Sequence, residues 1–250
     1  MEVVVLIEQI INDIQMELKK IAPSLAPEKK SRMCNILNSE NPNFECYGLT
    51  IAQIEEVAKS IFKKYEATYE IAVEVFKKLI SSDIHDEKFT GVFYLNQFKK
   101  NFDETTINLF QEQFMQYCDT WALCDSTCIR VIGPFLAKDD QLTQKMIETW
   151  IASENLWIRR AAMVILLKII LVKKDFDEAY VFNLVEKMLI SSEEYIQKGV
   201  GWLLKVCSQY KPDVIFNYLQ QNKKDLARLV LRYASEKLPK EQRTKVLGKS

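Results

Sequence analysis

Glycine and proline are scarce in this chain of 250 residues, which holds only six of each. An average chain of this length would hold about 30 of the two together. Neither Asn-Gly nor Asp-Gly occurs, so the strongest signal for a tight β-hairpin is also missing. Because β-sandwiches and barrels need many tight turns, the composition excludes them and favours an all-α fold.

Histidine is almost absent, and the cysteines are not paired in the sequence. The chain has one histidine, His85, and six cysteines without a C-x-x-C motif. Structural zinc needs clustered Cys and His ligands, and nucleophilic catalysis usually needs a histidine base. Gly-rich phosphate loops, G-x-S-x-G and H-E-x-x-H are missing as well. We therefore expect no metal and no cofactor, and we expect His85 to be an exposed residue of the polar connector 81–86.

Long hydrophobic runs are missing too. The longest, 161–172, has twelve residues and contains Lys168, so it is too short and too charged to cross a bilayer. The first residues lack the basic start of a signal peptide. The sequence therefore predicts a cytoplasmic protein without a membrane partner, associated with the nucleoid in a prokaryote or nuclear in a eukaryote. Its cysteines are expected to be reduced thiols.

Charge is balanced over the whole chain but not along it. Residues 1–125 hold 13 Lys+Arg and 20 Asp+Glu, whereas residues 126–250 hold 21 and 14. The second half therefore has a net charge of +7. Such an asymmetry either indicates a polyanionic partner on the basic side or reflects nothing more than solvated faces.

Helical periodicity extends from end to end, with short connectors and no long linker. Thr50 to Gln53 fits a capping box, and Pro27 and Pro212 fit the first turn of a helix. The expected helices are 2–21, 26–38, 50–65, 68–82, 86–101, 104–117, 120–137, 140–153, 155–173, 176–190, 193–210, 212–222, 224–237 and 240–247.

An internal repeat is visible within this helical pattern. Residues 153–162 resemble residues 192–200 after a shift of 38 or 39, and 86–93 is a weaker copy about two periods earlier. Two helices per unit and a period near 38 are typical of HEAT-like arrays. We therefore predict one all-α domain over 1–250, a HEAT-like helical-repeat solenoid with a concave groove.

Two residues near the middle of the chain could carry chemistry. Trp121 and Asp125 are four apart, so they lie on one face of the expected helix. A carboxylate beside an indole is partly desolvated, which strengthens its attraction for a cation. Taken alone, however, the two residues favour a structural role, with Trp121 in the core and Asp125 as an acid near the positive start of the helix.

Two rows of basic residues accompany the repeat. Lys198, Trp202 and Lys205 lie at i, i+4 and i+7, away from the apolar side of their helix. Arg160, Val164 and Lys168 form a similar row on the preceding repeat. A tryptophan between lysines suits a surface that meets sugar and phosphate, although each row could also be an ordinary solvated face.

Three segments resemble the AlkD-type DNA alkylation repair glycosylases. They are D-T-W-A-L-C-D-S at 119–126, W-I-A-S-E-N-L-W-I-R-R-A-A at 150–162 and I-Q-K-G-V-G-W at 196–202. They occur in the family's order and at similar separations, and the likeness is strong over about 115–222 and faint over 1–110. W-x-x-x-D, W-x-x-R and G-W have no reason to occur together in an unrelated HEAT protein.

The resemblance implies an activity and a set of site residues. It implies an alkylpurine DNA glycosylase that acts on double-stranded DNA containing cationic N3- or N7-alkylated purines and leaves an abasic site. A solenoid that binds DNA in its groove needs no partner subunit, so we expect a monomer. Asp125 then matches the catalytic aspartate, and Trp121 and Trp202 match the indoles that hold the deoxyribose. Arg160 matches the arginine that contacts phosphate. With the neighbouring arginine and the lysines of the two basic rows, the predicted DNA-binding residues are Arg160, Arg159, Lys198, Lys205 and Lys168.

One departure from the family keeps other functions open. Where the family often presents a tyrosine to the damaged strand, the matching residue here is Met33. A non-excising relative that binds branched, bent or damaged DNA is therefore the alternative hypothesis. A HEAT-like scaffold for other proteins is the third.

Overall fold

The structure is a computed structural model that describes residues 2–41, 43–189 and 191–248. Most of these residues are helical. These ranges contain no strand, and one isolated bridge joins Glu45 to Ile84. The prediction of an all-α helical-repeat fold is confirmed. The chain divides into two compact units, residues 1–127 and 128–250. Each unit is described by itself, and the single domain over 1–250 stays a prediction.

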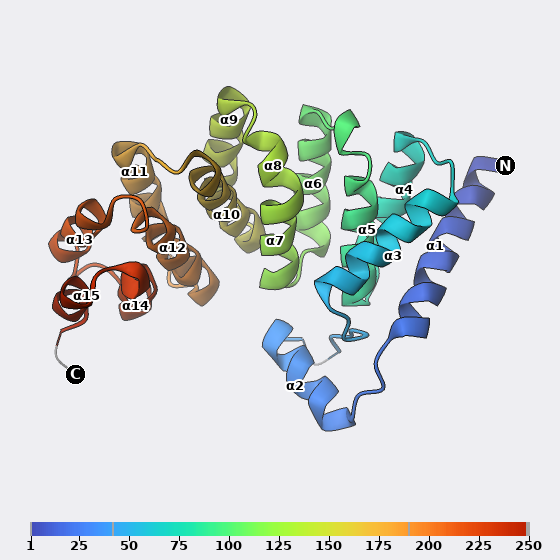
Figure 1. The fold of residues 1–250 in the computed structure, drawn as a ribbon, viewed down its shortest axis with the longest axis horizontal. Coiled ribbons are helices and arrows are strands. Elements are labelled where there is room, and N and C mark those ends of the chain that lie inside the picture. The colour runs from blue at the N-terminus through green and yellow to red at the C-terminus, as the bar shows by residue number, and fades with distance from the viewer. Residues whose placement is uncertain (1, 42, 190, 249–250) are drawn as a thin grey trace. The chain divides into compact units, whose positions relative to one another are not determined.

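The first unit is coloured from blue to green in Figure 1. Its described elements are α1 (Glu2–Ile21), α2 (Pro27–Leu37), α3 (Ile51–Lys64), α4 (Tyr69–Ile80), α5 (His85–Asn96), the 3-10 turn η1 (Lys99–Asn101), α6 (Glu104–Tyr117) and α7 (Trp121–Thr127).

Capping residues explain where several helices of the first unit begin. Thr50 and Gln53 form the predicted capping box of α3, and Asp103 and Thr106 form another at α6. The unit packs around α5, which lies against α3 and α4. A Cβ atom at Gly91 would lie 2.8 Å from the Cβ atom of Leu79, so this glycine lets α4 and α5 approach closely.

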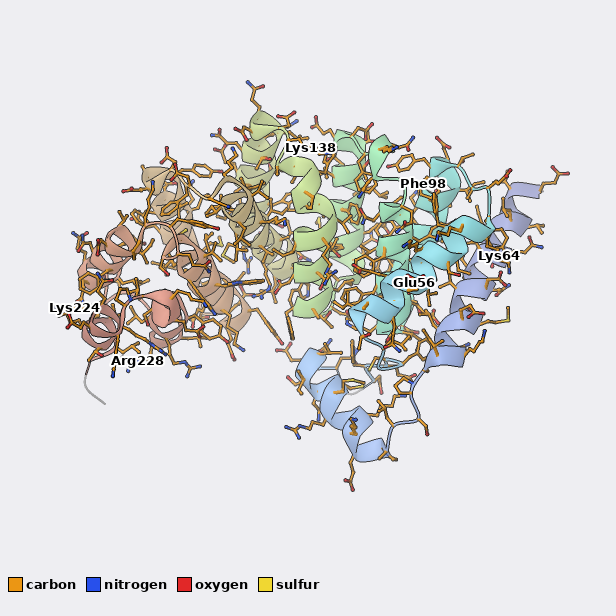
Figure 2. All side chains as sticks on the ribbon, viewed as in Figure 1. Glu56, Lys64, Phe98, Lys138, Lys224 and Arg228 are labelled. Carbon is orange, nitrogen blue, oxygen red and sulfur yellow. The ribbon has the colours of Figure 1, made fainter. Side chains whose placement is uncertain are left out.

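Aromatic rings extend this core to the end of α5. Phe98, labelled in Figure 2, packs edge-to-face against Phe62 of α3, with ring centroids 5.1 Å apart. Its ring also meets Tyr94 at 6.0 Å. Such tilted pairs contribute about 0.5–1.5 kcal/mol beyond their burial.

The second unit continues the chain from green to red in Figure 1. Its described elements are the π-helical stretch η2 (Cys128–Ile132), α8 (Gly133–Leu136), α9 (Asp140–Ile151), α10 (Leu156–Lys173), α11 (Glu178–Leu189), α12 (Glu194–Cys207), α13 (Pro212–Gln221), α14 (Arg228–Ala234), the 3-10 turn η3 (Ser235–Lys237) and α15 (Lys240–Leu247).

The repeat seen in the sequence corresponds to α10 and α12, which begin 38 residues apart and pack against each other. Small residues allow close approach on both sides of α12. A Cβ atom at Gly199 would lie 2.8 Å from the terminal methyl carbon of Met163, and one at Gly201 would lie 2.5 Å from the Cβ atom of Tyr233. Each helix therefore packs directly on its neighbours.

Three predicted helices need correction. The helix expected over 86–101 ends at Asn96, and the separate 3-10 turn η1 covers 99–101. The helix expected over 120–137 is interrupted by η2, and a Cβ atom at Gly133 would lie 2.5 Å from the carbonyl oxygen of Cys128. Gly133 therefore suits the backbone at the point where the π-helical stretch ends. The helix expected over 224–237 begins only at Arg228, because residues 222–226 form a turn closed by hydrogen bonds to the carbonyl of Asn222.

In the described ranges, no helix combines the length and the apolar character that crossing a membrane would require.

Candidate functional site

Trp121 and Asp125 lie on α7, a helix of seven residues. The Thr120 hydroxyl accepts a hydrogen bond from the backbone N–H of Leu123 at 3.1 Å, and this cap explains why the helix starts there. Trp121 is half-buried, and Asp125 is 8% exposed. A carboxylate held this far from bulk water acts more strongly on a nearby positive charge than a solvated one would.

The indole of Trp121 is fixed by a helix from the start of the chain. Its Nε1–H donates a hydrogen bond to the backbone carbonyl of Ile36, the penultimate residue of α2, at 3.2 Å. Just beyond α2, the side-chain amide of Asn38 donates to the carbonyl of Asp119 at 3.0 Å. The end of α2 is therefore bonded to the start of α7 at two points.

A buried lysine holds the same turn from the other side. The Nζ atom of Lys88 donates to the carboxylate of Asp119 at 2.7 Å and to the carbonyl of Tyr117 at 2.9 Å. The Lys88 side chain is only 8% exposed. Its charge is thus matched by a carboxylate and a carbonyl, which is the condition for burying an ion pair.

His85 is not the exposed loop residue that we expected. It is 5% exposed and is the first residue of α5, between the rings of Phe44 and Phe89 at centroid distances of 5.2 and 4.9 Å. Burial is the main cause that lowers the pKa of His85 to about 3. The imidazole is therefore neutral near pH 7 and serves as a packing residue.

The two acids that follow His85 are also buried, which the polar sequence gave no reason to expect. The Asp86 carboxylate accepts the backbone N–H groups of Tyr47 at 2.8 Å and Leu49 at 2.9 Å. Glu87 accepts the Tyr47 hydroxyl at 2.7 Å and the side-chain amide of Gln15 at 2.9 Å. Burial raises the pKa of Asp86, and its backbone hydrogen bonds partly offset that rise. These acids hold segment 44–49 against the start of α5.

In the second unit, the predicted arginines lie at the start of α10. Arg159 is ion-paired with Glu193 and donates to the carbonyls of Ser153 and Glu154 at 3.0 and 2.9 Å. Arg160 is 5% exposed and donates to the backbone carbonyl of Tyr195. Both guanidinium groups therefore tie the start of α10 to the start of α12.

Lys198 belongs to an aromatic cluster that sequence reasoning did not identify as part of a site. The rings of Trp157 and Tyr195 lie 5.2 Å apart, and the Nζ atom of Lys198 lies 5.9 Å from the Tyr195 ring. The same nitrogen is 2.6 Å from a carboxylate oxygen of Glu194. Trp157 and Tyr195 are 38 residues apart, which is one repeat. The cluster could therefore have been predicted from aromatic residues at equivalent positions of the repeat.

The remaining predicted residues lie farther along the same two helices. Trp202 is half-buried on α12, and Lys205, one turn later, pairs with Glu236. Lys168 is half-buried on α10, and its Cγ atom lies 2.7 Å from the position of a Cβ atom at Gly133. Among the described residues, no ion pair includes Lys168.

The structure thus divides the predicted site residues into two groups. Trp121 and Asp125 share one face of α7 in the first unit. The arginines and Lys198 gather where α10 and α12 begin, while Trp202, Lys205 and Lys168 lie one or two turns farther on. The exposed basic side chains of the second unit include Lys224 and Arg228, both labelled in Figure 2; neither was among the predicted residues.

Comparison with known proteins identifies the family. The sequence model of the family described as "DNA alkylation repair enzyme" matches residues 14–238, and the chain belongs to this family. No curated protein matches it. A solved structure titled "Predicted DNA alkylation repair enzyme from Enterococcus faecalis" is similar with a TM-score of 0.73 and 18% identity, covering 86% of this chain and 96% of that one. At that identity, the likeness shows a shared fold.

Proposed function

We propose that this DNA alkylation repair protein is a monofunctional DNA glycosylase for cationic N3- and N7-alkylated purines. The observation that carries the proposal is the placement of Asp125, nearly buried and one helical turn from Trp121 on α7. Its substrate is double-stranded DNA with alkylated bases, its product is an abasic site, and it acts as a monomer.

The chemistry needs few catalytic groups. A purine alkylated at N3 or N7 already carries a positive charge, so it leaves as a neutral base without a general acid. The sugar that remains resembles an oxocarbenium ion, which a fixed anion stabilises. Asp125 supplies this anion and orients the water that attacks the sugar carbon. A chain with one buried, neutral histidine can therefore catalyse this reaction.

The indoles hold the cationic sugar. The face of an indole attracts a cation by about 0.5–2 kcal/mol, depending on how dry the contact is. Trp121 suits this role because its N–H donates to the Ile36 carbonyl, and this bond orients the ring while α2 is closed. We assign the same role to Trp202 on α12.

The basic residues of the second unit bind the phosphates. Lys168 and Lys198 are half-buried, with stems packed on protein and ammonium groups able to reach a backbone phosphate. Lys205 and Arg159 would exchange their present acidic partners for phosphate oxygens. Arg160 is the most buried of the five, and it acts by fixing the start of α12 and adding positive charge beneath that surface.

One observation favours a second candidate, a family member that binds damaged or branched DNA without excising a base. Met33, which stands where the family often has a tyrosine, packs on Gly48: a Cβ atom there would lie 2.7 Å from the terminal methyl carbon of Met33. The residue therefore fills a space within its own unit and offers no aromatic face to a damaged strand.

Incubation with DNA methylated by dimethyl sulfate separates these functions. The proposal predicts release of 7-methylguanine and 3-methyladenine, detected by chromatography, and strand breaks only after alkali treatment of the abasic sites. Unmodified DNA is the control and should release no base. Tight, salt-sensitive binding without released base would support the second candidate, and the absence of both would leave a protein scaffold.

A further inference from the structure

One pair of cysteines joins an accessible thiol to a buried one. All six cysteines lie in the described ranges, and Cys34 alone is not buried. Its Sγ atom lies 3.4 Å from the Sγ atom of Cys46, which is 2% exposed. The other four cysteines are buried, so reagents in solution reach Cys34 first.

The helix that carries Cys34 has little else to hold it. None of the residues of α2 is buried, and Figure 1 shows this helix apart from α1, α3 and α4 of the same unit. Its ties to the rest of the unit are the hydrogen bond from Trp121 to Ile36, the neighbouring bond from Asn38, the contact between the two sulfur atoms and the packing of Met33 on Gly48. A helix with so few buried groups opens at a low cost in free energy.

Cys46, by contrast, lies on a fixed base. The residues on either side of it are bonded to the start of α5: the carbonyl of Glu45 accepts the backbone N–H of His85 at 3.0 Å, and the backbone N–H of Tyr47 donates to Asp86 at 2.8 Å. The thiol pair therefore bridges a weakly held helix and a well-anchored segment.

We propose that Cys34 and Cys46 form a modification site that a hydroperoxide converts into a disulfide, which fixes α2 to segment 44–49, and that a thiol reductant returns to two thiols by disulfide exchange. The thiolate of Cys34 attacks one peroxide oxygen and forms an S–O bond, which gives a sulfenic acid, while the O–O bond breaks. The other oxygen takes up the proton that the Cys34 thiol released and leaves as water or an alcohol. The sulfur of Cys46 then attacks the resulting sulfenic acid. The S–O bond breaks, and the departing hydroxide takes the Cys46 proton and leaves as water. The two sulfurs lose two electrons, and the peroxide gains them.

Cys34 reacts with the peroxide before Cys46 because Cys34 is accessible and Cys46 is buried. Burial and the hydrogen bond to Cys34 raise the pKa of Cys46 to about 12, so Cys46 stays protonated until an oxidised sulfur lies next to it. Only a small movement is then needed, because the sulfur atoms are already in contact at 3.4 Å.

The chemical test uses the reduced full-length protein and hydrogen peroxide. We expect a mass loss of about 2 Da, two joined peptides that contain Cys34 and Cys46 in a non-reducing digest, and full reversal by dithiothreitol. Cys34→Ser and Cys46→Ser should each abolish the cross-link, whereas the matched variant Cys118→Ser should keep it. Sulfinic acid at Cys34 with a free Cys46 thiol would overturn the proposal.

The structural test measures how firmly α2 is held. Trypsin can cut at Lys29, Lys30 and Arg32, all exposed on α2, after the helix opens locally. Oxidation should slow these cuts about fivefold, because the cross-link restricts the opened chain. Peroxide should leave the cutting rate of Cys46→Ser unchanged. A cross-link that forms without slowing trypsin would contradict the fixing of α2. Neither test depends on glycosylase activity.

Discussion

The two units position their candidate site residues in different ways. In the first, α7 has seven residues, and its start is held by side chains and carbonyls from residues 36, 38 and 88. In the second, α10 and α12 have 18 and 14 residues. Arginine side chains at the start of α10 join it to the start of α12, one repeat later. Hydrogen bonds that do not follow the repeat therefore hold the start of α7, which carries Trp121 and Asp125. The arginines of the second unit are held by bonds between successive copies of the repeat.

Net charge divides the molecule in the same way. The residues before 126 hold a net charge of −7, and those that follow hold +7. Several charged side chains of the acidic unit have their partners inside the same unit, as in the largely buried ion pair of Lys88 and Asp119. Most of the ion pairs of the basic unit lie at its surface, where water weakens them and a phosphate can replace the acidic partner.

The largest difference in stability should come from the two kinds of lysine. Lys88→Met removes one member of a largely buried ion pair and should lower the free energy of unfolding by about 3 kcal/mol, because Asp119 loses its partner. Lys198→Met breaks an exposed i,i+4 pair and should cost about 0.5 kcal/mol or less. Urea unfolding followed by circular dichroism measures both. Equal losses would mean that the two units are not held differently.

Between pH 7 and 5, the loss of stability should come mainly from the first unit, because it contains the single histidine. Burial lowers the pKa of His85 to about 3, whereas an unfolded histidine titrates near 6.5. The unfolded chain therefore binds a proton that the folded chain does not, and stability falls as the pH drops from about 6.5 towards 3. At pH 5 this effect should cost about 2 kcal/mol, at 1.36 kcal/mol for each pH unit.

His85→Phe removes this proton-binding group and keeps a ring between Phe44 and Phe89. The variant should lose about 2 kcal/mol less than the parent protein when the pH is lowered from 7 to 5. Unfolding curves at the two pH values measure the difference. Parallel losses in both proteins would show that His85 does not set the acid sensitivity.

Two glycines of α12 test the close packing of the second unit. Gly201→Ala places a methyl group 2.5 Å from the Cβ atom of Tyr233, which cannot move without its helix, so we expect a loss of about 1–3 kcal/mol. Gly199→Ala meets only the flexible end of Met163, and the higher helix propensity of alanine offsets that crowding by about 1 kcal/mol. Thermal unfolding should show a lower stability for Gly201→Ala than for Gly199→Ala. Equal stabilities would mean that the contact between Gly201 and Tyr233 is not tight.

The smallest effects should appear in DNA binding. Lys198→Gln should weaken binding to every sequence and make the slope of log affinity against log salt shallower by about 0.9, the contribution of one phosphate contact. Glu194→Gln frees Lys198 from its intramolecular partner and should tighten binding. Lys59→Gln, an exposed change on α3 of the acidic unit, is the control and should leave the slope unchanged. An equal change in slope for Lys59→Gln would contradict the assignment of phosphate binding to the second unit.

The structure of the second unit could be predicted better than that of the first because its helices follow a repeat that is visible in the sequence. The shift of 38 residues between the starts of α10 and α12 is visible in the sequence, and it identified both helices and their basic residues. Even there, the backbone around Gly133 was missed, because a π-helical stretch depends on which helix packs against it. The burial of Arg160 was missed for the same reason.

The support of α7 could not be read from the sequence. In the sequence, His85 belongs to a polar connector and Asp86 to Lys88 begin an expected helix. The burial of these residues depends on partners as distant as Gln15, Tyr47 and Asp119. Pairing of this kind is a property of the folded chain. The W-x-x-x-D spacing still predicted that Trp121 and Asp125 share a helix, since that relation needs only four residues.

The central claim is that the Asp125 carboxylate drives base release, and Asp125→Asn tests it most directly. The change keeps the shape of the side chain and removes its charge, so release of 7-methylguanine from methylated DNA should fall by a factor of about 10² to 10³ while DNA is still bound. Asp103→Asn is the matched control in the same unit, since asparagine also caps a helix, and it should keep full activity. Full release of 7-methylguanine by Asp125→Asn would contradict the account.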